Sequence, residues 1–170
     1  KMCPHFLSGR FFVRTGCQKV LVFIILWSGL LLLSQDSLAV DSFWKPDGLV
    51  YSGDWNDSLH WDNGVPNGAG DTATIADANS VYVVTLNLNP TLDAFTLSST
   101  TATLNATSRS MTVNGPIELT GGMVNWTAST WTGSGTFTNS IADLFLRGNC
   151  SINNDTFVQN GIAKIGANGT

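Results

Sequence analysis

The sequence contains few ionisable side chains, and this scarcity limits the chemistry that it can perform. Charged residues make up 12% of the 170-residue chain. Glu118 is the only glutamate, and His60 is the only histidine beyond residue 39. Glycosidases need paired carboxylates, and nucleophilic triads or zinc sites need histidine or cysteine at defined spacings. We find no such arrangement and therefore expect no catalytic residues, no metal site and no cofactor. The residues favour a non-catalytic protein, with an enzyme as the alternative.

Cysteine is equally scarce. Cys3 and Cys17 lie near the N-terminus, and Cys150 is the only cysteine in the rest of the chain. If the N-terminal segment is removed, no internal disulfide can form, so the fold has to be stabilised in another way. Sheets stacked over a continuous core would provide that stability. We expect Cys150, at a turn, to act as a small apolar residue.

The chain has one long apolar run, from Val20 to Leu33. It follows a basic segment and precedes small residues at Ser37 and Ala39. This layout is typical of a signal peptide, because the run is shorter than the roughly 20 residues that a helix needs to cross a bilayer. We predict a signal peptide over residues 1–39, cleaved before Val40, with an uncleaved anchor as the alternative. The expected location is secreted or cell surface, without a membrane span after cleavage.

Positive charge is sparse in the remainder of the chain. Beyond residue 39, four basic residues stand against eleven acidic ones, hence a formal net charge of −7. The basic residues are scattered along the sequence as Lys45, Arg109, Arg147 and Lys164. Nucleic-acid binding depends on clustered cations that neutralise phosphates. We therefore expect no nucleic-acid partner.

After residue 39 the chain falls into two parts that differ in amino-acid composition. From Val40 to about Asp77, turn residues such as Asn63-Gly64 and Gly70-Asp71 recur every few positions and leave no room for a helix of ordinary length. From Val81 onward, short runs rich in Thr, Val and Leu alternate with turns, which indicates short strands. We predict a Trp-, Gly- and Asp-rich N-terminal segment over residues 40–80 and repeats over residues 81–170.

Apolar residues recur at intervals of twenty in the second part. Leu97, Ile117, Phe137 and Phe157 form one such ladder. A second ladder runs in step through Ala102-Leu104-Ala106, Gly122-Val124-Trp126 and Ala142-Leu144-Leu146. Such a period is typical of a solenoid, in which equivalent side chains of successive coils stack. We predict an all-β fold, a right-handed parallel β-helix of about 20 residues per coil. An antiparallel sandwich is the alternative.

Several segments resemble a known family. They are residues 55–66 (WNDSLHWDNGVP), 70–75 (GDTATI), 133–139 (GSGTFTN) and 157–165 (FVQNGIAKI). These phrases are similar to those of bacterial exported β-helix proteins of the autotransporter-passenger type, with autotransporter-associated β-strand repeats. The resemblance implies the β-helix fold and export. The chain lacks that family's C-terminal barrel and resembles a fragment, so the repeats are expected to be truncated.

Trp44, Trp55 and Trp61 precede the first regular repeat and are candidate functional residues. Indole rings flanked by Asp and Asn side chains could stack on sugars, which makes these residues a candidate carbohydrate site. A solenoid also needs an atypical segment to cover its apolar end, and large buried indoles would provide it. We favour this cap over the carbohydrate site.

Two functions follow from these patterns. The favoured one is a non-catalytic exported or cell-surface β-helix scaffold or adhesin. The alternative is the N-terminal part of an exported β-helix enzyme that binds or degrades polysaccharide. Both have a polysaccharide or another cell-surface ligand as the expected partner.

Overall fold

The computed structural model describes residues 38–45, 51–140 and 142–166, so the predicted signal peptide lies outside the described residues except for its last two positions. Within these ranges there is one 3-10 helix, η1 (Ser58–His60), and no helix that could cross a membrane. The remaining elements are the strands β1 (Asp41–Phe43), β2 (Gly53–Asp54), β3 (Thr72–Ile75), β4 (Tyr82–Leu86), β5 (Thr91–Leu92), β6 (Ala94–Leu97), β7 (Ala102–Thr107), β8 (Ser110–Val113), β9 (Ile117–Leu119), β10 (Met123–Thr127), β11 (Thr130–Thr132), β12 (Thr136–Asn139), β13 (Asp143–Arg147), β14 (Ser151–Asn153), β15 (Thr156–Gln159) and β16 (Ile162–Gly166).

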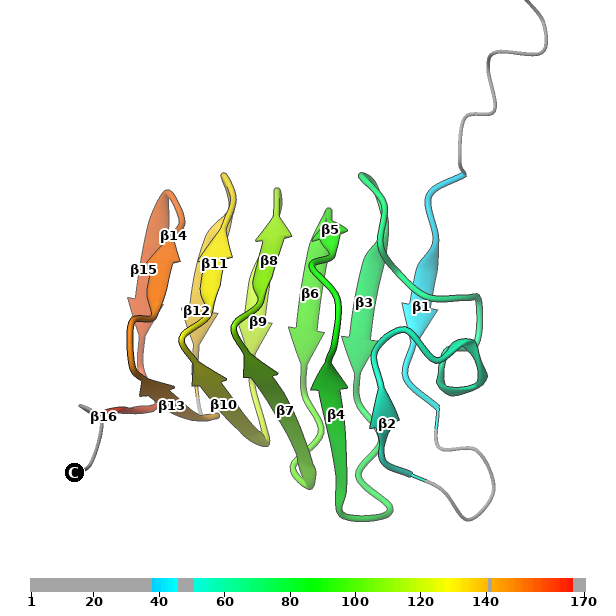
Figure 1. Cartoon of the computed structure of the whole chain (residues 1–170), viewed down its shortest axis with the longest axis horizontal. Coiled ribbons are helices and arrows are strands. Elements are labelled where there is room, and N and C mark those ends of the chain that lie inside the picture. Colours follow the sequence, from blue (N-terminus) through cyan, green and yellow to red (C-terminus); the bar gives the residue numbers. More distant parts are fainter. Residues whose placement is uncertain (1–37, 46–50, 141, 167–170) are drawn as a thin grey trace, which may run out of the picture. The chain divides into compact units, whose positions relative to one another are not determined.

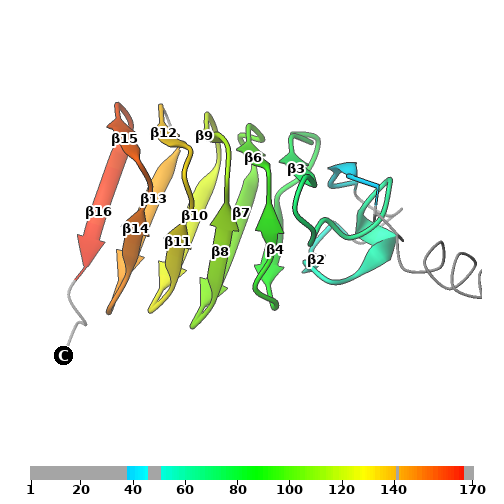
Figure 2. The same ribbon diagram turned by 90° about the horizontal axis from the view of Figure 1, so that it is seen from above.

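The strands form three parallel sheets, and the chain passes from one sheet to the next within each coil (Figures 1 and 2). The first sheet has the order β1-β3-β6-β9-β12-β15, the second β16-β13-β10-β7-β4-β2 and the third β14-β11-β8-β5. The resulting β-solenoid has about five turns, about 20 residues apart. The prediction of an all-β parallel β-helix is confirmed, and the sandwich alternative is wrong because neighbouring strands of each sheet run parallel.

Inward and outward side chains alternate along each strand, and the inward ones form the core. In β7, Ala102, Leu104 and Ala106 are buried while the residues between them face outward. The register aligns Leu104 with Val124 and with its equivalents in other coils, so one apolar column crosses the second sheet. Because the same inward position is apolar in coil after coil, each coil buries the face that its neighbour would otherwise expose. The second predicted ladder is thus confirmed.

The first predicted ladder needs one correction. Ile117 pairs with Phe137, and Phe137 pairs with Phe157, as expected. Leu97, however, pairs with Leu119, and the partner of Ile117 in the preceding coil is Phe95, so the spacing at this step is two positions longer than the expected twenty. Phe95 therefore takes the place of Leu97 in the buried column, and its own partner in the preceding coil is buried Ala73. Phe157 ends this column in the last described coil and is 49% exposed, although its ring stacks on Phe137 at 5.3 Å.

A longer corner explains the two extra residues. Four residues, Ser98 to Thr101, separate β6 from β7, and the Ser99 hydroxyl accepts the N–H of Ala102 to close this corner. One coil later, two residues lie between Leu119 and Gly122, which is the register equivalent of Ala102. Gly122 has φ +71, and a Cβ there would lie 2.6 Å from the carbonyl oxygen of Ala102. At this position glycine avoids the clash and adopts the positive φ, and the corner is two residues shorter than the one that Ser99 closes.

The first coil differs from the others in length. Asp41 in β1 pairs with Thr72 in β3, and Gly53 in β2 pairs with Val84 in β4, so both offsets are 31 residues. The extra length lies between β2 and β3, in residues 55–71, which we call the tryptophan loop. Successive coils carry β5, β8, β11 and β14 in the corresponding part of the circuit. The first and second sheets thus extend into the predicted N-terminal segment, where the tryptophan loop stands in place of a third-sheet strand.

Candidate functional site

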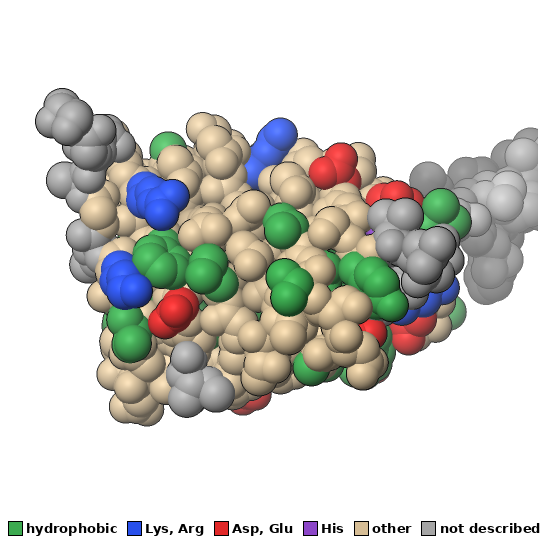
Figure 3. All heavy atoms as spheres, turned by 90° about the horizontal axis from the view of Figure 1, so that it is seen from below, with side chains coloured by type: hydrophobic (Ala, Val, Ile, Leu, Met, Phe, Trp, Pro, Cys, Tyr) green, Lys and Arg blue, Asp and Glu red, His purple; other side chains and the backbone are tan. Residues whose placement is uncertain are grey.

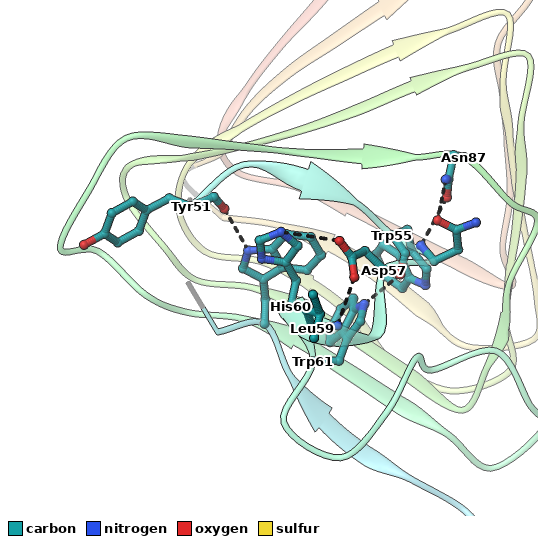
Figure 4. Close-up of polar contacts among 9 residues, drawn as sticks. Tyr51, Trp55, Asp57, Leu59, His60, Trp61 and Asn87 are labelled. Carbon is teal, nitrogen blue, oxygen red and sulfur yellow. Dashed lines mark hydrogen bonds and ion pairs between the residues drawn. The ribbon is translucent and has the colours of Figure 1, made fainter. Parts of the chain in front are cut away.

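The tryptophan loop is attached to the next coil by backbone and amide hydrogen bonds. Trp55 donates its backbone N–H to the carbonyl of Thr85 at 2.8 Å. Asn56 and Asn87 bind each other twice, at 3.2 and 2.7 Å (Figure 4). The Asp57 carboxylate accepts the N–H of Leu59 at 3.0 Å and caps η1. An aspartate in this position supplies a partner for a free N–H at the start of a helix, which explains why η1 begins there.

Three indoles and one imidazole pack together at this end of the core. We call Trp44, Trp55, His60 and Trp61 the cap cluster. Trp61 meets Trp44 edge-on at 5.1 Å and Trp55 at 4.9 Å, while Trp44 stacks on His60 at 4.7 Å. Edge-to-face and offset-stacked arrangements are those that aromatic rings prefer. The cluster continues into the repeats because Trp55 lies 6.0 Å from Phe95, the first phenylalanine of the buried column.

Each indole N–H of the cap cluster has a backbone partner. Trp44 donates to the carbonyl of Tyr51 at 3.3 Å and Trp61 to that of Trp55 at 2.7 Å (Figure 4). Trp55 donates to the carbonyl of Pro66 at 3.0 Å. A buried indole without a partner would leave its N–H desolvated and unpaired. These bonds therefore fix the orientation of all three rings and tie the tryptophan loop to itself.

Burial distinguishes the two roles predicted for the tryptophans. Trp44 is 3% exposed, Trp61 1% and Trp55 0%. A sugar stacks on an open ring face, and none of these rings presents one. Their burial supports the cap, as does the contact of Trp55 with the second coil. Carbohydrate binding at Trp44, Trp55 and Trp61 stays a prediction, and it would require these side chains to leave the core.

His60 is a packing residue of the cap cluster. It is buried, with Trp44 on one side and Gly53 on the other, where a Cβ would lie 2.3 Å from the imidazole Cδ2. Its Nε2 lies 3.9 Å from a carboxylate oxygen of Asp57. Within the part of the chain that the structure describes, no group of three or more His, Cys, Asp or Glu side chains surrounds a metal-sized space. His60 contributes its ring stacking on Trp44 and its close fit against Gly53 to the cap cluster.

Asp71 is an important residue that sequence reasoning missed. Its buried carboxylate accepts three backbone N–H groups: those of Val40 at 2.9 Å, Asn67 at 2.9 Å and Gly68 at 2.7 Å. It joins the end of the tryptophan loop to the residue before β1. The dense turn sequence around Pro66 indicated a tight loop, in which Asp commonly binds nearby N–H groups. The bond to the distant Val40 has no local signal in the sequence.

Three carboxylates of the repeats, which could be asked to act as a catalytic pair, lie on different parts of the circuit. Glu118 is exposed on β9 of the first sheet, and Asp143 lies on β13 of the second. Asp155 is exposed at the corner between β14 and β15. Cys150 is free and partly buried, and its Sγ lies 3.0 Å from the carbonyl oxygen of Trp126. This agrees with a structural role for the cysteine.

No family model, curated protein or solved structure matches the chain. The β-solenoid therefore rests on the register and burial described above. The autotransporter-passenger resemblance stays a prediction.

Proposed function

We propose that the chain is a non-catalytic β-solenoid scaffold or adhesin that acts outside the cytoplasm or at the cell surface. The observation that supports this role is the stacking of equivalent positions from coil to coil, closed at its beginning by a buried cap cluster. Such stacking fixes the spacing of outward side chains along the sheets. An adhesin or spacer needs that rigidity and uses a repeated surface in place of a single reactive site.

The outward side chains support the same role. Thr112 and Thr132 are register neighbours in the third sheet, and their hydroxyls lie 3.1 Å apart. Asn105 and Asn125 occupy successive coils of the second sheet, and their amides are bonded at 2.9 Å. Stacked hydroxyls and amides make a hydrated and ordered surface without high charge. This surface suits contact with hydroxyl-rich polymers or with other proteins.

Export is the part of the proposal that rests on the sequence of residues 1–39. The experiment is expression of the whole chain in a bacterium, followed by fractionation and N-terminal sequencing. The proposal expects exported protein that begins at Val40. Ile25→Asp, in the apolar run, should keep the chain in the cytoplasm, while Ser8→Asp, outside it, should not. Wild-type protein that stays in the cytoplasm with an uncut N-terminus would contradict export.

A second experiment tests the proposal that the chain is non-catalytic. Purified protein is incubated with neutral and acidic polysaccharides, and new reducing ends and unsaturated sugar products are measured. The proposal expects neither product above the level of a heat-denatured control. Reproducible cleavage of any of these polymers would favour the alternative, an exported enzyme acting on polysaccharide.

A further inference from the structure

The outward face of the second sheet carries a group of side chains that belongs neither to the cap cluster nor to the core. This sheet lies at the bottom of Figure 1, and Figure 3 shows its face, where two cationic groups gather beside apolar side chains. Arg147 and Lys164 lie around the ring of Phe145. The guanidinium carbon is 5.8 Å and the ammonium nitrogen 4.8 Å from the ring centroid. Lys164 lies beside this ring because the register pairs it with Phe145 across β13 and β16, and Arg147 follows Phe145 by two positions on β13.

These two cations have no counterion among the described residues. The structure records no ion pair there for Arg147 or Lys164, and the one His–carboxylate contact in those ranges involves His60. The face of an aromatic ring attracts cations, and both charges lie within 5.8 Å of the centroid of Phe145. Half of the basic residues beyond position 39 are thereby collected at one ring in a chain of acidic composition. An anionic group beside this ring would supply the counterion that both cations lack among the described residues.

A row of amides leads to this ring. Asn105, Asn125 and Phe145 are register neighbours in β7, β10 and β13, so their side chains follow one another along the stacking direction. The Asn125 amide donates to Asn105 at 2.9 Å, which orders both side chains. Strand spacing separates successive members by about 4.8 Å. The row offers hydrogen-bonding groups at regular intervals and ends at the paired cations.

We propose that this row binds an anionic polysaccharide that lies along the stacking direction. Its carboxylate or sulfate groups would contact Arg147 and Lys164, and its hydroxyls would contact Asn105 and Asn125. A polymer with phosphates at every residue would need more cations than this face has. A lipid surface would favour apolar side chains over amides. The inference names the partner class of the proposed adhesin and in that respect rests on the proposed function.

Asp143 sets a limit on the site. It lies on the same strand as Phe145 and Arg147, on the same face of the sheet. Its negative charge opposes an anionic ligand, and its removal should strengthen binding. The proposal therefore predicts one variant that binds the polysaccharide more tightly, as well as variants that bind it less tightly.

The test is affinity electrophoresis of the purified chain in gels that contain polygalacturonate, with dextran as the neutral polymer. We expect retardation by polygalacturonate only, decreasing as salt is added. Arg147→Gln combined with Lys164→Gln should weaken binding at least tenfold, and Asp143→Asn should strengthen it several-fold. Arg109→Gln is the matched control, because it removes a cation from the corner between β7 and β8 and should change binding less than twofold. Circular dichroism confirms that all variants fold.

Three outcomes would overturn the site. One is equal retardation by dextran or no retardation by polygalacturonate. Another is a loss with Arg109→Gln as large as with the double variant, which would indicate non-specific ion exchange. The third is tighter binding to DNA or to vesicles of anionic phospholipid than to the polysaccharide. The assay uses purified protein, so a failure of export would leave its result intact, and a failure of binding would leave export and the scaffold role intact.

Discussion

The first coil and the later coils share the first and second sheets but are stabilised by different contacts. Later coils repeat a pattern: apolar columns inside, hydroxyls and amides outside, and an offset close to 20 residues. The first coil uses contacts that occur once, namely three indole N–H bonds, a His60 ring stacked on Trp44, and the carboxylate of Asp71. A repeated contact has neighbours of the same kind to support it, whereas a unique contact has none. The cap should therefore respond to single substitutions that spare the repeats.

The largest effect should come from placing a charge in the repeated core. Phe137 is completely buried between Ile117 and Phe157 and contacts Trp131 edge-on at 4.9 Å. Phe137→Asp should lower the free energy of unfolding by more than about 5 kcal/mol, because it removes a buried ring and adds an unpaired buried charge. Thermal unfolding followed by circular dichroism measures the change. Thr136→Asp, at the exposed neighbouring position, is the control and should cost less than about 1 kcal/mol.

The next effect tests the cap. Trp55→Ala should cost about 3–5 kcal/mol, because the side chain is fully buried and its N–H bond to Pro66 is lost. Leu59→Ala, in the same loop but 63% exposed, should change stability by less than about 0.5 kcal/mol. Urea unfolding measures both. If Trp55→Ala and Trp61→Ala kept parental stability but lost retention on a polysaccharide column, the cap would be refuted in favour of a sugar site.

A smaller effect is expected at Asp71. Asp71→Ala leaves three backbone N–H groups without their acceptor, including that of Val40. We expect a loss of about 2–3 kcal/mol, since hydrogen bonds to a charged group exceed neutral ones. Asp62→Ala is the comparison, because its carboxylate accepts one backbone N–H, from Phe43, at an exposed site. Hydrogen exchange of β1 amides should increase with Asp71→Ala, and an unchanged rate would show that the carboxylate is not what holds β1 to the loop.

The smallest effect is a pH dependence of stability that arises at the corner between β3 and β4. Burial raises the pKa of Tyr82 above 10.0, the nearby charge of Asp77 adds to this, and the hydrogen bond with Ser99 opposes it. The folded state then holds the phenol proton more tightly than the unfolded state. Its contribution is complete below pH 10 and is lost as pH rises through the folded pKa. Tyr82→Phe should flatten this alkaline decline in urea unfolding, and an unchanged slope would assign the decline to other groups.

The repeats were predictable because their contacts recur in the sequence. Alternation and the twenty-residue spacing of Ile117, Phe137 and Phe157 identified the coil and the core directly. The pairing of Ile117 with Phe95 in place of Leu97 was missed, because a corner can gain two residues without changing the apolar pattern on either side. Composition showed that residues 40–80 differ from the repeats.

The unique contacts were less predictable. The Asp71 bond to Val40 spans 31 residues and has no repeated counterpart from which it could be inferred. The gathering of Arg147 and Lys164 at Phe145 depends on the register that places β16 beside β13. In the sequence alone, these cations are scattered. The predicted ladder through Leu144 and Leu146 implies that Phe145, between them, points outward, and this was the available signal.

Cysteine pairs across neighbouring coils test the central claim, the stacking register, most directly. Thr96 and Glu118 are paired residues on β6 and β9, whereas Ser98 stands at the simple twenty-residue spacing from Glu118 and is not its partner. In a Cys150→Ser background, mild oxidation followed by peptide mass spectrometry should show a disulfide for Thr96→Cys with Glu118→Cys, since paired strand positions lie within disulfide range. Ser98→Cys with Glu118→Cys should remain reduced. The opposite result, or no disulfide in either pair, would contradict the register and the solenoid built on it.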